Sequence, residues 1–264
     1  MEHLQLSKVD RVATITINRP EARNAMSREM WPALLKLLEE VQADADVACV
    51  VVTGADPAFC AGGDVKAMIE RAEGSNPMTV EEETTLLRGF MECSRLLHEM
   101  PKPTIAAING ACAGAGFALA LSCDLRIADS QAKFTTAFAR VAGSGDFGGS
   151  WFLSKMIGTA KARELYYFAN TFTGAEAAQM GVVNIAVDRE DFAATLQDWT
   201  NRLATGPTVA LALMKENMNL AEQGSLSEAL DQEARNMALA FRSEDHVEAA
   251  KAFVEKRRPE FKGK

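Results

Sequence analysis

Two glycine-rich segments constrain this chain more than any single side chain does. The first covers residues 59–64 (FCAGGD) and follows an apolar run at residues 49–52. The second covers residues 109–116 (NGACAGAG) and follows a short apolar run at residues 104–108. A tight glycine turn between a strand and a helix presents unpaired backbone N–H groups and the positive end of the helix dipole to an anion. Two such turns facing each other would hold one oxyanion from both sides, as acyl-transfer and enolate chemistry requires.

Each segment also has a simpler explanation, because glycine is the default residue of tight turns. Residues 114–116 (GAG) could belong to a dinucleotide fingerprint, but they lie mid-chain and the helix after them ends near Cys123. The uncharged stretch 104–123 is long enough for a membrane span, yet Asn109, its glycines and its many alanines make it too weakly apolar. We therefore expect a buried turn and helix there, and no membrane partner.

The composition argues against several classes of protein. The chain has 264 residues, of which 48% are hydrophobic, enough for one large domain or one domain with an appendage. Its formal charge of −8 argues against nucleic-acid binding, although residues 251–262 are locally basic. The five cysteines lack CxxC spacing, so we expect buried, reduced thiols and neither disulfides nor a metal site. The first residues lack the apolar region of a signal peptide, which makes the cytoplasm the expected compartment.

Strand and helix patterns alternate along most of the chain, and only helices follow. Strands are expected at residues 12–17, 49–53, 104–108, 125–128 and 182–187. Helices are expected after the N-cap candidates Ser27 and Asp64, across residues 80–98, and throughout the chain after residue 192. Alternating elements predict a mixed sheet core. The helical end carries an apolar stripe that predicts packing against another body, such as a partner subunit: Leu226, Leu230, Met237 and Phe241.

Six stretches spread over nearly the whole chain resemble the crotonase family, also called the enoyl-CoA hydratase/isomerase family. They are residues 19–26, 58–66, 103–124, 124–128, 174–183 and 253–257. The resemblance implies an α/β fold, a crotonase-like spiral of repeated ββα units with a C-terminal helical trimerisation region. We accordingly divide the chain into a core for acyl-CoA binding and catalysis, residues 1–200, and a helical oligomerisation region, residues 201–264. The resemblance also implies an acyl-CoA thioester substrate, an enolate-like intermediate and a homotrimer or homohexamer, with no cofactor beyond the coenzyme A of the substrate.

The resemblance assigns roles residue by residue. The oxyanion amides of the family fall on Gly63 and Ala115, which donate through the backbone. The positions that match its CoA-binding regions are Ala22, Asn24, Ala61, Asp64, Val65 and Lys66. Phe253 and Lys256 resemble tail positions that help to hold the nucleotide of a neighbouring subunit. Simpler explanations remain open, because the lysines could lie on solvated helix faces and Asp64 is well placed as a helix cap.

The chain departs from the hydratases of the family at two positions. Those enzymes carry two glutamates that position and deprotonate a water, and the matching residues here are Ala118 and Phe138. Neither side chain can transfer a proton, so two-glutamate hydration is not expected. Phe138 instead becomes a candidate for contact with the acyl group. Together with other aromatic residues it hints at an apolar and aromatic acyl group: Phe117, Phe134, Phe147 and Trp151.

One carboxylate remains in a position that suggests catalysis. Asp146 lies eight residues after Phe138, where the resemblance places the acid/base aspartate of several isomerases and the nucleophilic aspartate of an aryl-CoA dehalogenase. Burial between Phe147 and Trp151 would raise the pKa of Asp146 and make it a better proton shuttle. Alternatively, Asp146 only turns the chain before a helix that begins near Gly149.

A single carboxylate suffices for a 1,3-proton shift, in which it removes a proton from one carbon and returns it to another. The leading hypothesis is therefore an enoyl-CoA isomerase that uses Asp146 while Gly63 and Ala115 hold the enolate oxygen. Three alternatives stay open: a hydratase with a rearranged acid/base set, a thioester hydrolase or dehalogenase in which Asp146 attacks covalently, and a non-catalytic acyl-CoA binding protein. RNA binding is disfavoured by the acidic balance.

Overall fold

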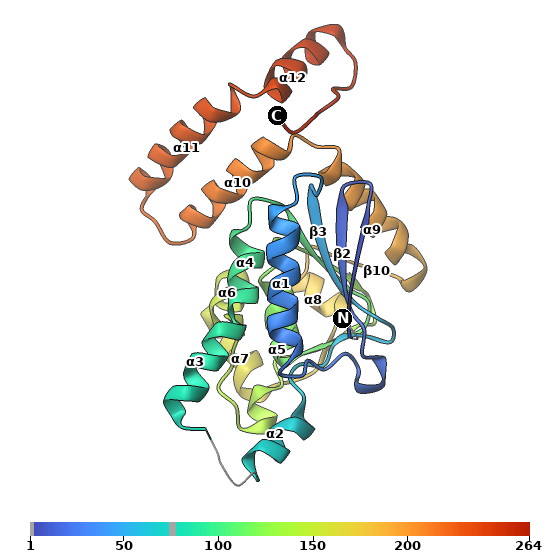
Figure 1. Ribbon diagram of the computed structural model, residues 1–264, viewed down its shortest axis with the longest axis vertical. Helices are drawn as coiled ribbons and strands as arrows, with labels where there is room; N and C mark the ends of the chain where they lie inside the picture. The colour runs from blue at the N-terminus through green and yellow to red at the C-terminus, as the bar shows by residue number, and fades with distance from the viewer. Residues whose placement is uncertain (1–2, 74–77) are drawn as a thin grey trace.

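The computed structural model describes residues 3–73 and 78–264, and two sheets lie at its centre (Figure 1). The six strands of the larger sheet are ordered β1-β2-β3-β5-β7-β10. Their bounds are β1 Leu4–Val9, β2 Val12–Ile17, β3 Cys49–Gly54, β5 Thr104–Ile108, β7 Leu125–Asp129 and β10 Ile185–Val187. β1 pairs antiparallel with β2, and the remaining pairs are parallel. The four strands of the smaller sheet are β4 Ala58–Cys60, β6 Ala111–Ala113, β8 Lys133–Thr135 and β9 Phe172–Thr173.

The two sheets are connected by a repeated unit. β3, β5 and β7 each belong to the larger sheet, and the strand that follows each of them along the chain belongs to the smaller sheet. A helical segment follows each such pair, so the chain repeats a ββα unit, as the resemblance implied. β5 is buried along its whole length, which explains its uninterrupted run of small and apolar side chains.

The helices surround both sheets. Their bounds are α1 Met30–Ala43, α2 Val65–Ala72, α3 Val80–Phe90, α4 Glu92–Glu99, α5 Gly114–Leu121, α6 Gly149–Ile157, α7 Thr159–Phe168, α8 Gly174–Gln179, α9 Arg189–Ala204, α10 Thr208–Ala221, α11 Leu226–Ala240 and α12 Glu244–Glu255, with the 3-10 turns η1 Pro20–Ala22 and η2 Phe138–Val141. α1 and α5 contribute to the main hydrophobic core, which includes Leu34, Leu38 and Leu119. α9 covers a second cluster on the larger sheet through Phe192. α9 crosses residue 200, and the division of the chain at that residue stays a prediction.

The last three helices project away from the sheets, with α10 and α11 side by side (Figure 1). Lys215 of α10 anchors this region to the core. Its buried Nζ donates to the Leu97 carbonyl at 2.8 Å and the Lys102 carbonyl at 3.1 Å, and it pairs with Asp124 at 2.8 Å. These partners compensate the cost of burying the charge.

Three expectations about individual elements need correction. Ser27 does not cap α1: the N-cap residue is Glu29, and the Ser27 hydroxyl donates to the Glu29 carboxylate at 2.8 Å. Residues 80–98 form two helices that meet at Met91: α4 buries apolar side chains such as Leu96 and Leu97, whereas no residue of α3 is fully buried. The strand expected at residues 182–187 begins only at Ile185, because the Val182 carbonyl accepts from the Arg126 guanidinium.

Candidate active site

The two glycine-rich segments lie against each other. The first segment begins within β4 and the second contains β6, and these strands are parallel neighbours in the smaller sheet, so both turns leave the sheet at the same edge. A Cβ atom on Gly62 would lie 3.0 Å from the Ala113 carbonyl oxygen and 3.5 Å from the Ala115 nitrogen. A Cβ atom on Gly116 would lie 2.6 Å from the side chain of Cys60. This close approach requires glycine at both positions.

The predicted oxyanion donors lie at this contact. Met26 forms a bridge with the first segment: its N–H donates to the Gly62 carbonyl at 2.8 Å, and its carbonyl accepts from the Asp64 N–H at 3.1 Å. Successive N–H groups of an extended chain point in opposite directions, so the N–H of Gly63 points away from Met26. Ala115 is the second residue of α5, where a backbone N–H has no partner within its helix. This geometry is compatible with donation from both amides to an anion, and their role as oxyanion donors stays a prediction.

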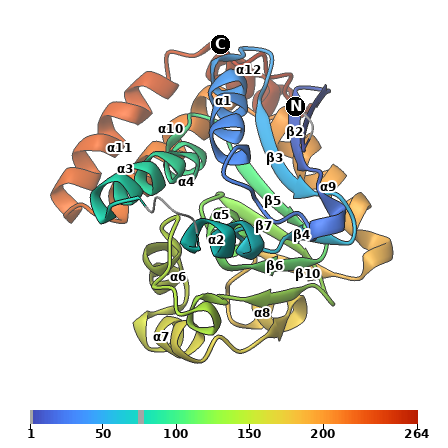
Figure 2. The ribbon, with the colours of Figure 1, turned by 60° about the horizontal axis from the view of Figure 1, so that its bottom comes forward.

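α2 follows the first segment directly and lies in front of α5 in the view of Figure 2. A Cβ atom on Gly63 would lie 2.5 Å from the methyl group of Met68, so Met68 lies over Gly63. Val65 and Lys66 are exposed in the first turn of α2, and the Ala61 N–H donates to a carbonyl of the first loop at 3.0 Å. Their proposed contacts with CoA stay predictions.

Asp64 is fixed by hydrogen bonds and is not a free carboxylate. Its Oδ1 accepts from the N–H groups of Lys66 at 3.1 Å and Ala67 at 3.3 Å, which confirms its role as a helix cap. Its Oδ2 pairs with Arg19 at 2.6 Å. The hydrogen bond from Arg19 is the main cause that lowers the pKa of Asp64 below its ordinary value. Asp64 therefore stays ionised and is a poor candidate for proton transfer at neutral pH.

Asn24 holds the first loop in place. Its side chain is fully buried (0% exposed) and donates to the carbonyls of Ala55 and Ala58 at 2.6 Å each. Its Oδ1 accepts from the Arg19 N–H at 2.8 Å. The Asn24 side chain is thus occupied, so a CoA contact at this loop would have to come from backbone or from neighbours such as Ala22.

Asp146 is the opposite of Asp64 in its surroundings. Its Oδ1 is buried and has no hydrogen-bond partner within the described part of the chain. Burial raises the pKa of Asp146 from its ordinary value to about 6. Its neighbour Phe147 stacks on Trp31 with ring centroids 4.0 Å apart, which fixes the backbone beside the carboxylate. α6 begins at Gly149, as predicted, with the Gly149 N–H bound to the Asp146 carbonyl at 3.0 Å.

Ala118 and Phe138, which stand at the two glutamate positions of hydratases, lie among apolar and aromatic residues. A Cβ atom on Gly149 would lie 3.0 Å from the Cβ of Ala118 and 2.5 Å from the hydroxyl oxygen of Tyr166. The Tyr166 ring stacks on Phe138 with centroids 5.8 Å apart. Burial, followed by the nearby charge of Asp146, raises the pKa of Tyr166. Tyr166 was not predicted from the sequence, because no motif marks it and its role arises from packing between α5, α6 and α7.

The five aromatic residues that pointed to an aromatic acyl group in the sequence do not lie together in the structure. Phe117 and Phe134 pack edge to face at 5.6 Å within the hydrophobic core. Trp151 packs against His98 with centroids 5.5 Å apart. Phe147 is buried in the same core and stacks on Trp31, so Phe138, beside Tyr166, is the one of these five residues that still fits contact with the acyl group, and the suggested aromatic lining is smaller than expected.

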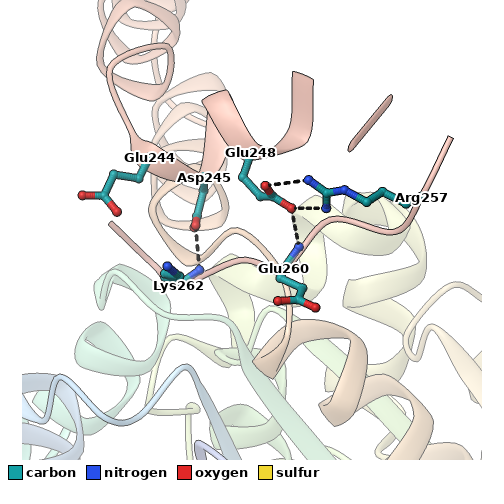
Figure 3. A pocket seen from close by; sticks show the side chains of 6 residues that line it. All are labelled: Glu244, Asp245, Glu248, Arg257, Glu260 and Lys262. Atoms are coloured by element: carbon teal, nitrogen blue, oxygen red, sulfur yellow. Dashed lines mark hydrogen bonds and ion pairs between the residues drawn. The ribbon is translucent and has the colours of Figure 1, made fainter. Parts of the chain in front are cut away.

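The C-terminal residues lie far from this site within the chain (Figure 1). Phe253 is 86% exposed near the end of α12, and Lys256 ends that helix in a left-handed conformation. The tail after it folds back onto α12, where the Asp245 and Glu248 carboxylates accept from the backbone N–H groups of Lys262 at 2.7 Å and Glu260 at 3.0 Å (Figure 3). The role of Phe253 and Lys256 at a neighbour's nucleotide stays a prediction that requires an assembly.

The described residues give little support for a cysteine nucleophile, a metal site or a membrane-spanning helix. All five cysteines are free and buried, as expected, and burial raises the pKa of the Cys60 thiol to about 12, which makes it a poor nucleophile. Within residues 3–73 and 78–264, no three potential metal-ligating side chains gather as a metal site. None of the helices in the same ranges combines the length and hydrophobicity that a membrane crossing needs.

Comparison with known proteins gives a consistent result. The sequence pattern of the family described as enoyl-CoA hydratase/isomerase matches residues 7–264. The 1,2-epoxyphenylacetyl-CoA isomerase of Escherichia coli (strain K12) is 39% identical over 263 residues, which cover 98% of each chain. The short-chain-enoyl-CoA hydratase of Clostridium acetobutylicum is 33% identical over 261 residues, covering 98% of this chain and 97% of the relative. The crystal structure of an enoyl-CoA hydratase from Polaromonas sp. JS666 superposes with a TM-score of 0.90 at 30% identity, covering 98% of this chain and 99% of the other.

Proposed function

Because this chain belongs to the enoyl-CoA hydratase/isomerase family, we propose that it is an isomerase that shifts a double bond of an acyl-CoA by proton transfer through Asp146. One observation carries the proposal. Asp146 has a buried carboxylate oxygen that no described residue binds and a pKa raised to about 6, whereas Ala118 and Phe138 stand where hydratases carry glutamates. The site therefore has one suitable base and lacks the usual pair.

The proposed mechanism uses the two glycine-rich segments and one carboxylate. The thioester oxygen binds between the amides of Gly63 and Ala115. Ionised Asp146 removes a proton from one carbon of the acyl chain, and the resulting negative charge on the oxygen is stabilised by both N–H donors. Protonated Asp146 then returns the proton to a second carbon, so no atom is gained or lost. A pKa of about 6 leaves Asp146 mostly ionised at neutral pH and makes it a stronger base than an exposed aspartate.

The relatives support an acyl-CoA substrate but divide over the reaction. One is named as an isomerase and the other as a hydratase. Addition of water normally needs a second group that orients or protonates, and the two glutamate positions here are apolar or aromatic. This difference favours the isomerase.

A panel of acyl-CoA thioesters tests the proposal. Each thioester is incubated with the protein and followed by mass spectrometry and ultraviolet absorbance. An isomerase changes the absorbance of an unsaturated thioester without changing its mass. A mass gain of one water molecule would instead show a hydratase, and release of free CoA thiol would show a hydrolase.

Binding is a separate requirement of the proposal. Acyl-CoAs at concentrations near saturation should raise the thermal stability of the protein, because a ligand that binds only the folded state shifts the unfolding equilibrium. Absence of both binding heat and thermal protection across the panel would contradict the family-based function.

A further inference from the structure

We propose that the hydroxyl of Tyr166 selects the acyl group, by donating a hydrogen bond to an oxygen atom that the acyl group carries beyond its thioester. The substrates would then be CoA thioesters whose acyl group is itself oxygenated. This inference rests on the proposed function, because it needs an acyl-CoA whose thioester oxygen lies at Gly63 and Ala115. The Tyr166 hydroxyl would be a second polar side-chain group in the site, beside the proposed base Asp146.

The packing of four elements places this hydroxyl in the site. α5 packs against α6, α6 against α7, and α7 against η2. Gly149 at the start of α6 lies so close to the Tyr166 hydroxyl that a Cβ atom there would be 2.5 Å from it. Gly145 stands next to Asp146, and a Cβ atom on it would lie 2.9 Å from the Tyr166 ring. Glycine at both positions therefore leaves room for the phenol beside the catalytic candidate.

The hydroxyl is held in position without a hydrogen bond of its own. Phe138 stacks on the ring nearly in parallel, with an interplanar angle of 17°. Among the described residues no hydrogen bond links a protein atom to the Tyr166 hydroxyl, and its oxygen is not fully enclosed by the protein. A partly buried tyrosine hydroxyl normally has a partner, so a ligand oxygen is a suitable one. The raised pKa of Tyr166 keeps the group protonated and hence a donor.

The position along α5 indicates which part of the ligand this donor meets. Ala115 and Ala118 are three residues apart, almost one helical turn, which separates them by about 5 Å along the axis. The Tyr166 hydroxyl lies near Ala118. It is therefore about one turn further along α5 than the Ala115 amide that would hold the thioester oxygen. About 5 Å corresponds to the span of a few bonded carbons. The donor therefore meets acyl atoms beyond the thioester and not the thioester oxygen itself.

Binding of matched ligand pairs tests this inference without any need for turnover. The probes are phenylacetyl-CoA with 2-hydroxyphenylacetyl-CoA, and butyryl-CoA with acetoacetyl-CoA, and the dissociation constants are measured by calorimetry. In at least one pair the wild-type protein should bind the oxygenated member about tenfold more tightly, as expected for one added hydrogen bond. Tyr166→Phe should remove this preference and leave the affinity for the other member within about twofold.

Two further variants make the result decisive. Tyr167→Phe is the matched control, because that side chain is 71% exposed, and it should keep the preference. Gly149→Ala should displace the hydroxyl and reproduce the loss, which covers the case that Tyr166→Phe folds poorly. A preference that survives in both Tyr166→Phe and Gly149→Ala, or that is absent from the wild type in both pairs, would overturn the inference. If no thioester binds the wild type at all, the proposed function fails first and the role of Tyr166 fails with it.

Discussion

At the scale of single residues, the environment gives two aspartates opposite properties. Asp64 accepts hydrogen bonds from Arg19 and from the start of α2, which lower its pKa. Asp146 has a buried oxygen with no hydrogen-bond partner in the part of the chain that the structure describes, and burial alone raises its pKa to about 6. Only a carboxylate of the second kind titrates close to neutral pH, where a proton can be both accepted and returned.

The first prediction concerns the pH dependence of activity. The base must be ionised, so kcat/KM should rise as the pH increases through about 6 and level off above it. The measurement is kcat/KM for the best substrate across this range, with circular dichroism at each pH to show that the protein stays folded. A constant kcat/KM from about pH 5 to pH 8 would exclude a base with this pKa.

The second prediction concerns stability. Because the folded-state pKa of Asp146 lies above the ordinary value of 3.8, the folded protein keeps a proton that the unfolded chain loses between pH 3.8 and about pH 6. Stability therefore falls as the pH rises through this window, and the deficit persists above it. Asp146→Asn should raise the free energy of unfolding at about pH 8 by on the order of 1 kcal/mol, and change it little at about pH 4.

Asp198→Asn is the control for this comparison, because Asp198 is exposed on α9 and forms an ion pair with exposed Arg202. Thermal unfolding at both pH values gives the result. A lower melting temperature for Asp146→Asn at the higher pH would show that the carboxylate is stabilised by contacts and is not strained by burial.

At the scale of elements, the site depends on the close approach of two backbone turns. The amides of Gly63 and Ala115 belong to different ββα units and can serve one oxygen only while β4 and α5 keep their distance. Gly116 sets that distance, since a Cβ atom on it would lie 2.6 Å from the Cys60 side chain and backbone. Glycine is therefore a packing requirement here as well as a turn residue.

The third prediction follows from this contact. Gly116→Ala should push α5 away from β4, lower stability by about 1–3 kcal/mol and reduce turnover, because overpacking forces the backbone to shift. Gly89→Ala is the matched control, since a Cβ atom placed there would meet no described atom within 4 Å outside its own helix backbone. Urea unfolding and kcat measure both effects. Unchanged turnover in Gly116→Ala would show that the two turns need no such spacing.

The elements that the sequence predicted well are those with a strong local pattern. β2, β3 and β5 follow apolar runs, and α9 to α12 follow helical periodicity. β1 was missed because it is an edge strand of which only Leu4 is buried. The strands of the smaller sheet were missed because they have two or three residues and partly coincide with the glycine-rich segments, where propensity predicts turns. Their formation depends on pairing between distant parts of the chain.

In the candidate site, too, features set by local sequence could be predicted, whereas features set by packing of distant segments could not. Glycine spacing and the family resemblance led to Gly63, Ala115 and Asp146, and the roles assigned to these residues stay predictions. The surroundings that make Asp146 unusual could not, because the Trp31 stack and the position of Tyr166 depend on tertiary packing. The hydrogen bonds by which the Asn24 side chain joins two loops could not be predicted either, and the assignment of Asn24 to the ligand stays a prediction.

At the scale of the whole molecule, the C-terminal helices present apolar side chains that the single chain does not cover. The exposed residues include Met218, Leu226, Leu230, Met237, Phe253 and Val254. An exposed apolar surface of this kind is typical of an interface. It is also the region that would bring Phe253 and Lys256 to the CoA of a neighbour.

The fourth prediction is that the protein assembles as a trimer or hexamer at micromolar concentration. Light scattering coupled to gel filtration measures the mass. Met237→Glu should shift the protein towards smaller species, because it places a charge on the apolar stripe. Ser227→Glu adds the same charge at an exposed polar position of α11 and should leave the mass unchanged. A wild-type monomer would contradict the prediction and remove the proposed role of Lys256.

The most direct test of the central claim, that Asp146 moves a proton between two carbons of an acyl-CoA, compares wild type with Asp146→Asn on a 3-enoyl-CoA. The rise in absorbance of the conjugated product gives the rate, mass spectrometry checks that the mass is unchanged, and calorimetry gives the affinity. Asp146→Asn should lower turnover by about 10²- to 10⁴-fold while the affinity changes little, and Asp198→Asn should behave as wild type. Near-normal turnover in Asp146→Asn, or a wild-type product heavier by one water molecule, would contradict the account.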